Sequence, residues 1–83
     1  MNAFYKLRIQ HIDRSEKSNA AKAKKYLELL GSITSWDAIT HFRDTRLAVS
    51  ISEIKRRYGL NIVTIMELDK NTGKRYGRYH LIG

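Results

Sequence analysis

Arg46 and Arg56 carry the most specific recognition chemistry in this chain of 83 residues. A guanidinium group presents a planar fork of N–H donors, which matches a phosphate, a carboxylate or the major-groove edge of guanine. Between the two arginines, Val49, Ser50 and Ser52 supply an apolar surface and two small hydroxyl groups. An apolar side chain suits a thymine methyl group, and a hydroxyl can donate to or accept from a base edge. This stretch therefore holds residue types that can read base pairs, provided that one element places them together.

The net charge favours the same kind of partner. Sixteen Lys and Arg residues stand against eight Asp and Glu residues, giving a formal net charge of +8 and a pI of about 10.1. A domain this basic is typical of proteins that bind nucleic acid. A basic protein that is simply well solvated, or one that binds acidic proteins or anionic membranes, would have the same composition.

Residue types that perform catalysis or hold metal ions are sparse. The chain has no Cys, which excludes disulfides and thiolate metal sites. Its three histidines, His11, His41 and His80, lie far apart in the sequence without ligand spacing. No Ser-His-Asp arrangement, phosphate-binding glycine loop or dense carboxylate cluster is present. We therefore expect no catalytic residue, no metal site, no cofactor and no enzymatic activity.

Length and hydropathy predict one small cytoplasmic domain. A chain of 83 residues can bury one modest core. No apolar run approaches the roughly 20 residues that cross a bilayer. Residues 1–14 alternate apolar and polar side chains and lack the apolar block of a signal peptide. These features predict a soluble intracellular protein that does not bind membranes.

Two helices precede the stretch with the arginines. Apolar residues recur at helical spacing over Ala20–Leu30, and Gly31 can take the left-handed conformation that ends a helix. A shorter helix is expected over Trp36–Phe42. Thr34 can cap its first turn, with Asp37 as the reciprocal partner of a capping box.

The third predicted helix, Arg46–Tyr58, places the candidate recognition residues. Asp44 and Thr45 suit its N-cap, and Gly59 ends it. One stripe of this helix is apolar and is expected to face the core: Leu47, Ile51, Ile54 and Tyr58. The opposite side carries Thr45, Val49, Ser52 and Arg56.

Extended segments are predicted on both sides of these helices. Ser32–Thr34 is long enough for one short strand, and Asn61–Leu68 is rich in β-branched residues. A polar turn over residues 69–74 leads into a return strand, Arg75–Ile82. Residues Phe4–Ile12 place Tyr5, Leu7 and Ile9 on one side at period two, which predicts a half-buried N-terminal strand. That strand could pair with a sheet edge, mediate a dimer or remain a loose basic arm.

The order helix, short strand, helix, helix and hairpin defines the fold class. It is an α+β winged helix-turn-helix with three helices, a C-terminal hairpin as the wing and an extra N-terminal strand. We divide the chain into an N-terminal strand and loop, residues 1–19, and the winged domain, residues 20–83. We find no internal repeat, low-complexity tract or proline-rich linker.

Three motifs resemble the short winged helix-turn-helix proteins of phages and prophages. They are GSITSWDA at residues 31–38, RLAVSISEIK at residues 46–55 and GLNI at residues 59–62. The resemblance extends over most of the chain, from about residue 20 to residue 81. It implies binding of double-stranded DNA through the third helix, in the cytoplasm of a bacterial host.

The predicted DNA contacts fall into two classes. Base edges would be contacted by residues of the third helix, namely Thr45, Arg46, Val49, Ser50, Ser52 and Arg56. Phosphates would be contacted by cations of the turn, the third helix and the wing, namely Arg43, Lys55, Arg57, Lys70, Lys74, Arg75 and Arg78.

Two further residues near these contacts have two interpretations each. Glu53 could accept from cytosine, but pairing with Arg56 or Arg57 on the same helix is favoured. Tyr76 in the wing could touch a sugar or stack, and a cross-strand contact is slightly favoured.

Two classes of function follow. The favoured one is a sequence-specific DNA-binding protein that acts as a transcriptional regulator or as an excisionase-like architectural factor, with homodimers or cooperative oligomers on the DNA. The alternative is a protein-binding inhibitor of a host defence or polymerase component, of the anti-CRISPR kind, whose basic face meets an acidic protein.

Overall fold

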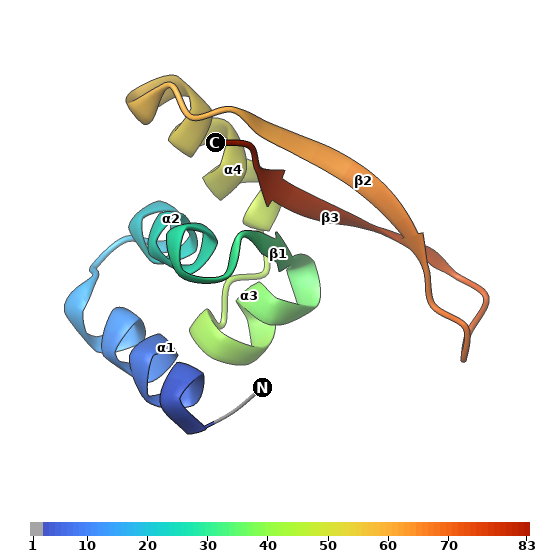
Figure 1. The fold of residues 1–83 in the computed structure, drawn as a ribbon, viewed down its shortest axis with the longest axis horizontal. Helices are drawn as coiled ribbons and strands as arrows, with labels where there is room; N and C mark the ends of the chain where they lie inside the picture. Colours follow the sequence, from blue (N-terminus) through green and yellow to red (C-terminus); the bar gives the residue numbers. More distant parts are fainter. Residues whose placement is uncertain (1–2) are drawn as a thin grey trace.

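The computed structural model of this chain describes residues 3–83. Four helices and three strands follow one another in the order α1, α2, β1, α3, α4, β2 and β3 (Figure 1). Their bounds are α1 Ala3–Ser15, α2 Asn19–Leu30, β1 Ser32–Thr34, α3 Ser35–Phe42, α4 Leu47–Tyr58, β2 Ile62–Leu68 and β3 Arg75–Leu81. The three predicted helices, the short strand and the hairpin are confirmed, with bounds that differ by one residue at several ends.

Local capping explains where the middle helices begin and end. Ser18 accepts a hydrogen bond from the backbone N–H of Ala21 at the start of α2. At the start of α3, Thr34 and Asp37 form the predicted capping box, in which each side chain accepts from the other residue's backbone N–H. Gly31 ends α2 with a φ of 86°, a conformation that favours glycine.

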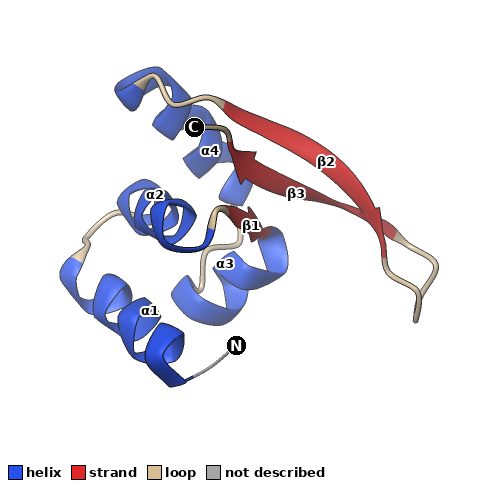
Figure 2. Ribbon diagram, viewed as in Figure 1, coloured by secondary structure: helices blue, strands red, loops and turns tan. Residues whose placement is uncertain are grey.

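The strands form one antiparallel sheet in the order β1-β3-β2. Ile33 of β1 lies opposite Tyr79 of β3, and Glu67 of β2 lies opposite Tyr76. The hairpin formed by β2 and β3 extends well beyond the helices, and its turn is the most distant part of the molecule in Figure 2. The sheet is therefore anchored at the end that includes β1, and its other end forms a wing.

A single core joins the helices to the anchored end of the sheet. Its fully buried large side chains are Leu27, Ile33, Leu47 and Ile54. Tyr79 and Leu81 of β3 pack against this core in a partly buried position. Burial of this kind supplies most of the favourable free energy of a small domain.

The predicted N-terminal strand is wrong, because residues 3–15 form the helix α1. Ile9 and Ile12 are buried at a spacing of three residues, whereas Leu7 is 66% exposed. The alternation of Tyr5, Leu7 and Ile9 suggested period two, but burial follows the helical period. α1 lies beside α2 and α3 in Figure 1 and adds two isoleucines to the common core.

The predicted inner stripe of α4 needs one correction at its end. Leu47, Ile51 and Ile54 are buried as expected, but Tyr58 is 49% exposed. The helix ends at Tyr58, beyond the part that the core covers. The ring of Tyr58 instead lies under the ammonium group of Lys24, 4.8 Å from the ring centroid.

Candidate nucleic-acid interface

The turn between α3 and α4 sets the direction of the candidate recognition helix. Arg43 ends α3 with a φ of 55°, and it is the one non-glycine residue with positive φ among residues 3–83. The backbone N–H of Arg43 donates to Ile39 O over 3.0 Å, and that of Asp44 donates to Ala38 O over 3.1 Å. This left-handed residue turns the chain sharply while its charged side chain stays exposed.

Asp44 holds the start of α4 from inside the turn. Its carboxylate is buried and accepts from the backbone N–H of Arg46 over 2.8 Å and from Ser50 Oγ over 2.9 Å. The N-cap position itself is Arg46, which has no side-chain capping bond. Asp44 therefore does the capping that the sequence suggested, two residues before the helix.

Ser50 is withdrawn from the set of base contacts, because its side chain is buried and bonded to Asp44. At about 100° per residue, Ser50 lies roughly 40–60° from Leu47 and Ile54 around the helix. That places it at the edge of the buried stripe. The sequence pattern missed this because a small polar residue at such a position can face either way.

The outer face of α4 is exposed and mixed in chemistry. Thr45 and Arg46 lie exposed at its start, and Ser52 and Arg56 lie exposed farther along. Val49 is 52% exposed between them. A shallow hollow on this face is lined by Ala48, Val49, Ser52, Glu53 and Arg56. The helix thus presents two guanidinium groups around a small apolar surface.

Pairing on α4 separates the arginines into two kinds. Glu53 Oε1 lies 3.1 Å from Nε of Arg57, which confirms the favoured interpretation of Glu53. No ion pair involves Arg46 or Arg56 among the residues that the structure describes. These two guanidinium groups are therefore available to a ligand without first breaking a contact within the protein.

The turn of the wing carries the second group of exposed cations. Asp69 N–H donates to Lys74 O, and Gly73 N–H donates to Asp69 O, each over 2.8 Å. Gly73 has a φ of 72°, as this tight turn requires. Lys70, Lys74 and Arg75 are exposed around it.

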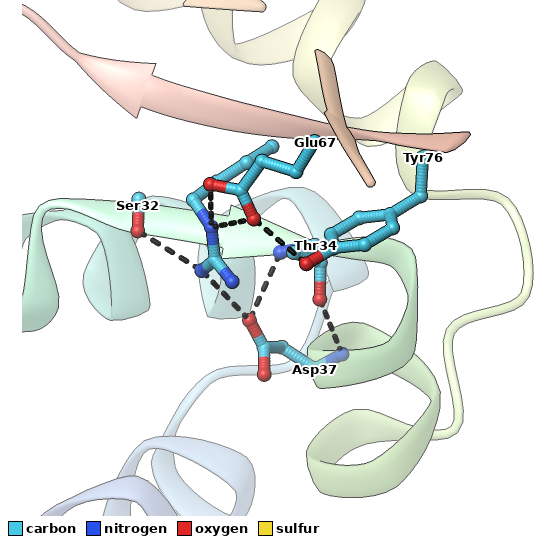
Figure 3. Close-up of polar contacts among 6 residues, drawn as sticks. Ser32, Thr34, Asp37, Glu67 and Tyr76 are labelled. Carbon is cyan, nitrogen blue, oxygen red and sulfur yellow. Dashed lines mark hydrogen bonds and ion pairs between the residues drawn. The ribbon is translucent and has the colours of Figure 1, made fainter. Parts of the chain in front are cut away.

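Arg78 has a different role from the predicted phosphate contact. Its Nε lies 3.0 Å from Glu67 Oε2, and its Nη1 lies 3.3 Å from Ser32 Oγ and 3.9 Å from Asp37 Oδ2. Figure 3 shows its guanidinium group between these partners, which come from β2, β1 and α3. With its donors directed at protein groups, Arg78 is removed from the set of free cations.

Tyr76 and Glu67 complete this group, which we call the wing clamp: Ser32, Asp37, Glu67, Tyr76 and Arg78. The hydroxyl of Tyr76 donates to Glu67 Oε1 over 2.8 Å, so the favoured cross-strand contact is present and its partner is a carboxylate (Figure 3). Hydrogen bonds from Tyr76 and then from Arg78 hold the pKa of Glu67 below its usual value.

The clamp also borders the core. Burial, followed by the negative charge of Asp37, raises the pKa of Tyr26 on α2 to about 12. The sequence analysis did not identify the clamp. The expected turn over residues 69–74 could have indicated it, because that turn places Glu67 opposite Tyr76 and diagonal to Arg78.

Two searches of residues 3–83 returned nothing. No group of three or more His, Asp or Glu side chains in this range could hold a metal ion. Within the same range, no helix is both long enough and apolar enough to cross a membrane.

Comparison with known proteins agrees with the geometry. No curated protein and no solved structure gives a significant match. A family model described as a winged helix-turn-helix domain matches residues 19–83. The matched region includes α2, β1, α3, α4 and both strands of the wing, and this family suggests DNA binding. The chain belongs to the winged helix-turn-helix family.

Proposed function

We propose that this protein binds double-stranded DNA in a sequence-specific way, with α4 in the major groove and the wing on the sugar-phosphate backbone. The observation that carries the proposal is the exposed outer face of α4, where Arg46 and Arg56 have no ion-pair partner among the described residues. The opposite face of the same helix is buried at Leu47, Ile51 and Ile54. A helix held in this way is a rigid support for side chains that read bases.

Base recognition is assigned to the exposed members of the predicted set. Arg46 and Arg56 can each donate two hydrogen bonds to guanine, which is worth about 1–3 kcal/mol of discrimination per base pair. Val49 would contact a thymine methyl group, and the hydroxyls of Thr45 and Ser52 would donate to or accept from neighbouring bases.

Phosphate binding is assigned to the exposed cations around this face. They are Arg43, Lys55, Arg57, Lys70, Lys74 and Arg75. Each phosphate that is neutralised releases condensed counterions, so the affinity should fall steeply as salt rises. Arg57 would exchange its contact with Glu53 for a phosphate, at a small cost because the pair is on the surface.

The biological role that we propose is a transcriptional regulator or an excisionase-like architectural factor. Both roles use the same helix and wing on duplex DNA. They differ in how copies assemble, since a regulator binds symmetric half-sites and an architectural factor binds adjacent sites and bends the DNA. Mapping the protected sites on the DNA that flanks the gene would distinguish them.

The test is a fluorescence-anisotropy titration of labelled duplexes at several salt concentrations. One probe has a random sequence, and the other is the DNA that flanks the gene. We expect tighter binding to the flanking DNA and a steep salt dependence on both probes. The double variant Arg46→Ala/Arg56→Ala should lose most of the preference, about 1–3 kcal/mol for each arginine.

The matched control is the double variant Arg14→Ala/Lys17→Ala, which removes the same charge near the end of α1, away from the proposed face. It should keep the preference for the flanking DNA. Equal losses in both variants would reduce the interaction to net charge alone. The absence of duplex binding at low salt would overturn the proposal and favour the protein-binding inhibitor.

A further inference from the structure

The outer edge of the wing holds a second feature that DNA binding does not use. β2 is the last strand of the sheet, and β3 covers only one of its two edges. In Figure 2 no helix or strand lies beside the outer edge of β2. A free strand edge presents unpaired backbone donors and acceptors, which another strand can satisfy.

The hydrogen-bond pattern identifies the residues that point outward. Ile82 N–H donates to Asn61 O, and Asp69 N–H donates to Lys74 O, so residues 61 and 69 bond toward β3. Backbone groups alternate in direction along an antiparallel strand. The even-numbered residues of β2 therefore turn their N–H and C=O groups away from β3. Across residues 3–83, no backbone bond between elements uses these groups of Thr64, Met66 and Leu68.

The side chains of β2 leave this edge unusually apolar. Val63 and Ile65 project from one face of the strand, and Met66 and Leu68 project from the other. All four are more than a third exposed. Glu67 is the one charged residue of β2, and it is already bonded to Arg78 and Tyr76. Proteins usually protect such an edge with charges, a proline or a bulge, and residues 62–66 have no charge or proline.

We propose that the outer edge of β2 pairs with β2 of a second copy of this chain, antiparallel and centred on Ile65. The two three-stranded sheets would then join into one sheet of six strands. This inference concerns self-association and does not depend on the proposed DNA binding.

The chemistry of β2 favours a second copy as the occupant. In the register centred on Ile65, Thr64 lies opposite Met66 of the other copy, and both turn their backbone groups toward the new pairing. Ile62 lies opposite Leu68 of the other copy, so apolar side chains meet on both faces. The two isoleucines at position 65 meet on the two-fold axis. Like-paired apolar side chains of this kind stabilise antiparallel strands.

Charge complementarity supports the same arrangement. The end of the segment that leads into the wing turn carries Glu67 and Asp69. The other end follows Gly59, directly after the basic last turn of α4 with Lys55, Arg56 and Arg57. Antiparallel pairing brings the acidic end of each copy toward the basic end of the other.

Single cysteines test the register directly, because the chain has none of its own. In the proposed pairing, the two Cα atoms at position 65 are about 4.5 Å apart, which a disulfide can bridge. The two Cα atoms at position 63 are four residues out of step, about 14 Å apart. Under mild oxidation, Ile65→Cys should form covalent dimers at least about tenfold faster than Val63→Cys. A mixture of Val63→Cys with Glu67→Cys should also cross-link.

Sedimentation equilibrium without DNA tests the association itself. The wild type should pass from the 9.7 kDa monomer to the dimer as its concentration rises. Ile65→Lys places two like charges on the axis and should weaken the dimer about tenfold or more. Leu7→Lys is the matched control, because it makes the same change at an exposed apolar position on α1 and should dimerise like the wild type.

Three results would overturn the proposal. They are a wild type that stays monomeric up to about 1 mM, cross-linking of Val63→Cys that is as fast as that of Ile65→Cys, or an Ile65→Lys variant that dimerises like Leu7→Lys. Circular dichroism of each variant establishes that it is folded. Because no DNA is present, the proposal can survive if DNA binding fails, and the reverse also holds.

Discussion

α4 and the β2–β3 hairpin carry the two halves of the proposed DNA surface, but different interactions hold them in place. α4 buries one complete face, including Leu47, Ile51 and Ile54. In β2, Ile62 alone is buried, and the rest of the strand extends past the core. The hairpin depends instead on its backbone pairing and on the wing clamp around Arg78. The recognition helix is thus rigid through packing, and the wing is positioned by polar contacts that solvent and pH can reach.

The largest expected effect separates the two faces of α4. Ile51→Ala should lower the free energy of unfolding by about 2–5 kcal/mol, because it leaves a cavity in the core. Val49→Ala, on the exposed face, should change it by less than about 0.5 kcal/mol and should alter DNA affinity. Urea unfolding of both variants measures the difference. Equal losses would contradict the assigned orientation of α4.

A smaller effect is expected where the turn meets the helix. Ser50→Ala removes a donor from the buried carboxylate of Asp44 and should cost about 1–3 kcal/mol of stability. Ser52→Ala is the matched control, because Ser52 is exposed two residues farther along the same helix. Its stability should stay within about 0.5 kcal/mol of the wild type. If Ser52→Ala proved the more damaging, the assignment of Ser50 to the turn would be wrong.

The smallest effect is expected in the wing and depends on pH. The folded-state pKa of Glu67 lies below its ordinary value of 4.5, so its contribution to stability is fully present above that value. The contribution is lost as pH falls through the lower folded-state pKa. Glu67→Gln lacks this titration. The difference in unfolding midpoint between wild type and Glu67→Gln should therefore shrink on acidification.

Thermal unfolding from neutral pH to about pH 3 measures that difference, and other acidic groups cancel in the comparison. A difference that stayed constant with pH would show that Glu67 does not stabilise the wing as a carboxylate. NMR shifts of the Tyr76 amide report the same event inside the hairpin. They should move with pH in the wild type and remain flat in Glu67→Gln.

Much of the fold could be predicted because its signals are local. The capping box of Thr34 and Asp37, the glycine that ends α2 and the polar turn of the wing each specify a boundary within a few residues. The apolar period of α4 placed Leu47, Ile51 and Ile54 correctly. Tyr58 failed only because the core ends before the helix does.

The site was less predictable because it depends on which partner a polar side chain finds. Arg78 has the charge of a phosphate contact, but Ser32, Asp37 and Glu67 come close to it from three other elements. Ser50 has the size of a base contact, but Asp44 accepts its hydroxyl from the buried turn. Neither partner is visible in the spacing of α4 or β3 alone.

The sequence by itself determined α2, α3, α4 and the hairpin, together with the basic charge of the whole chain. These features follow from caps, turns and apolar periods that act over a few residues. Only the tertiary structure decided that residues 3–15 form a helix, because Tyr5, Leu7 and Ile9 fit both periods until Ile9 and Ile12 meet the core. It also decided which cations stay free, because a charge is captured only when other elements bring acceptors to it.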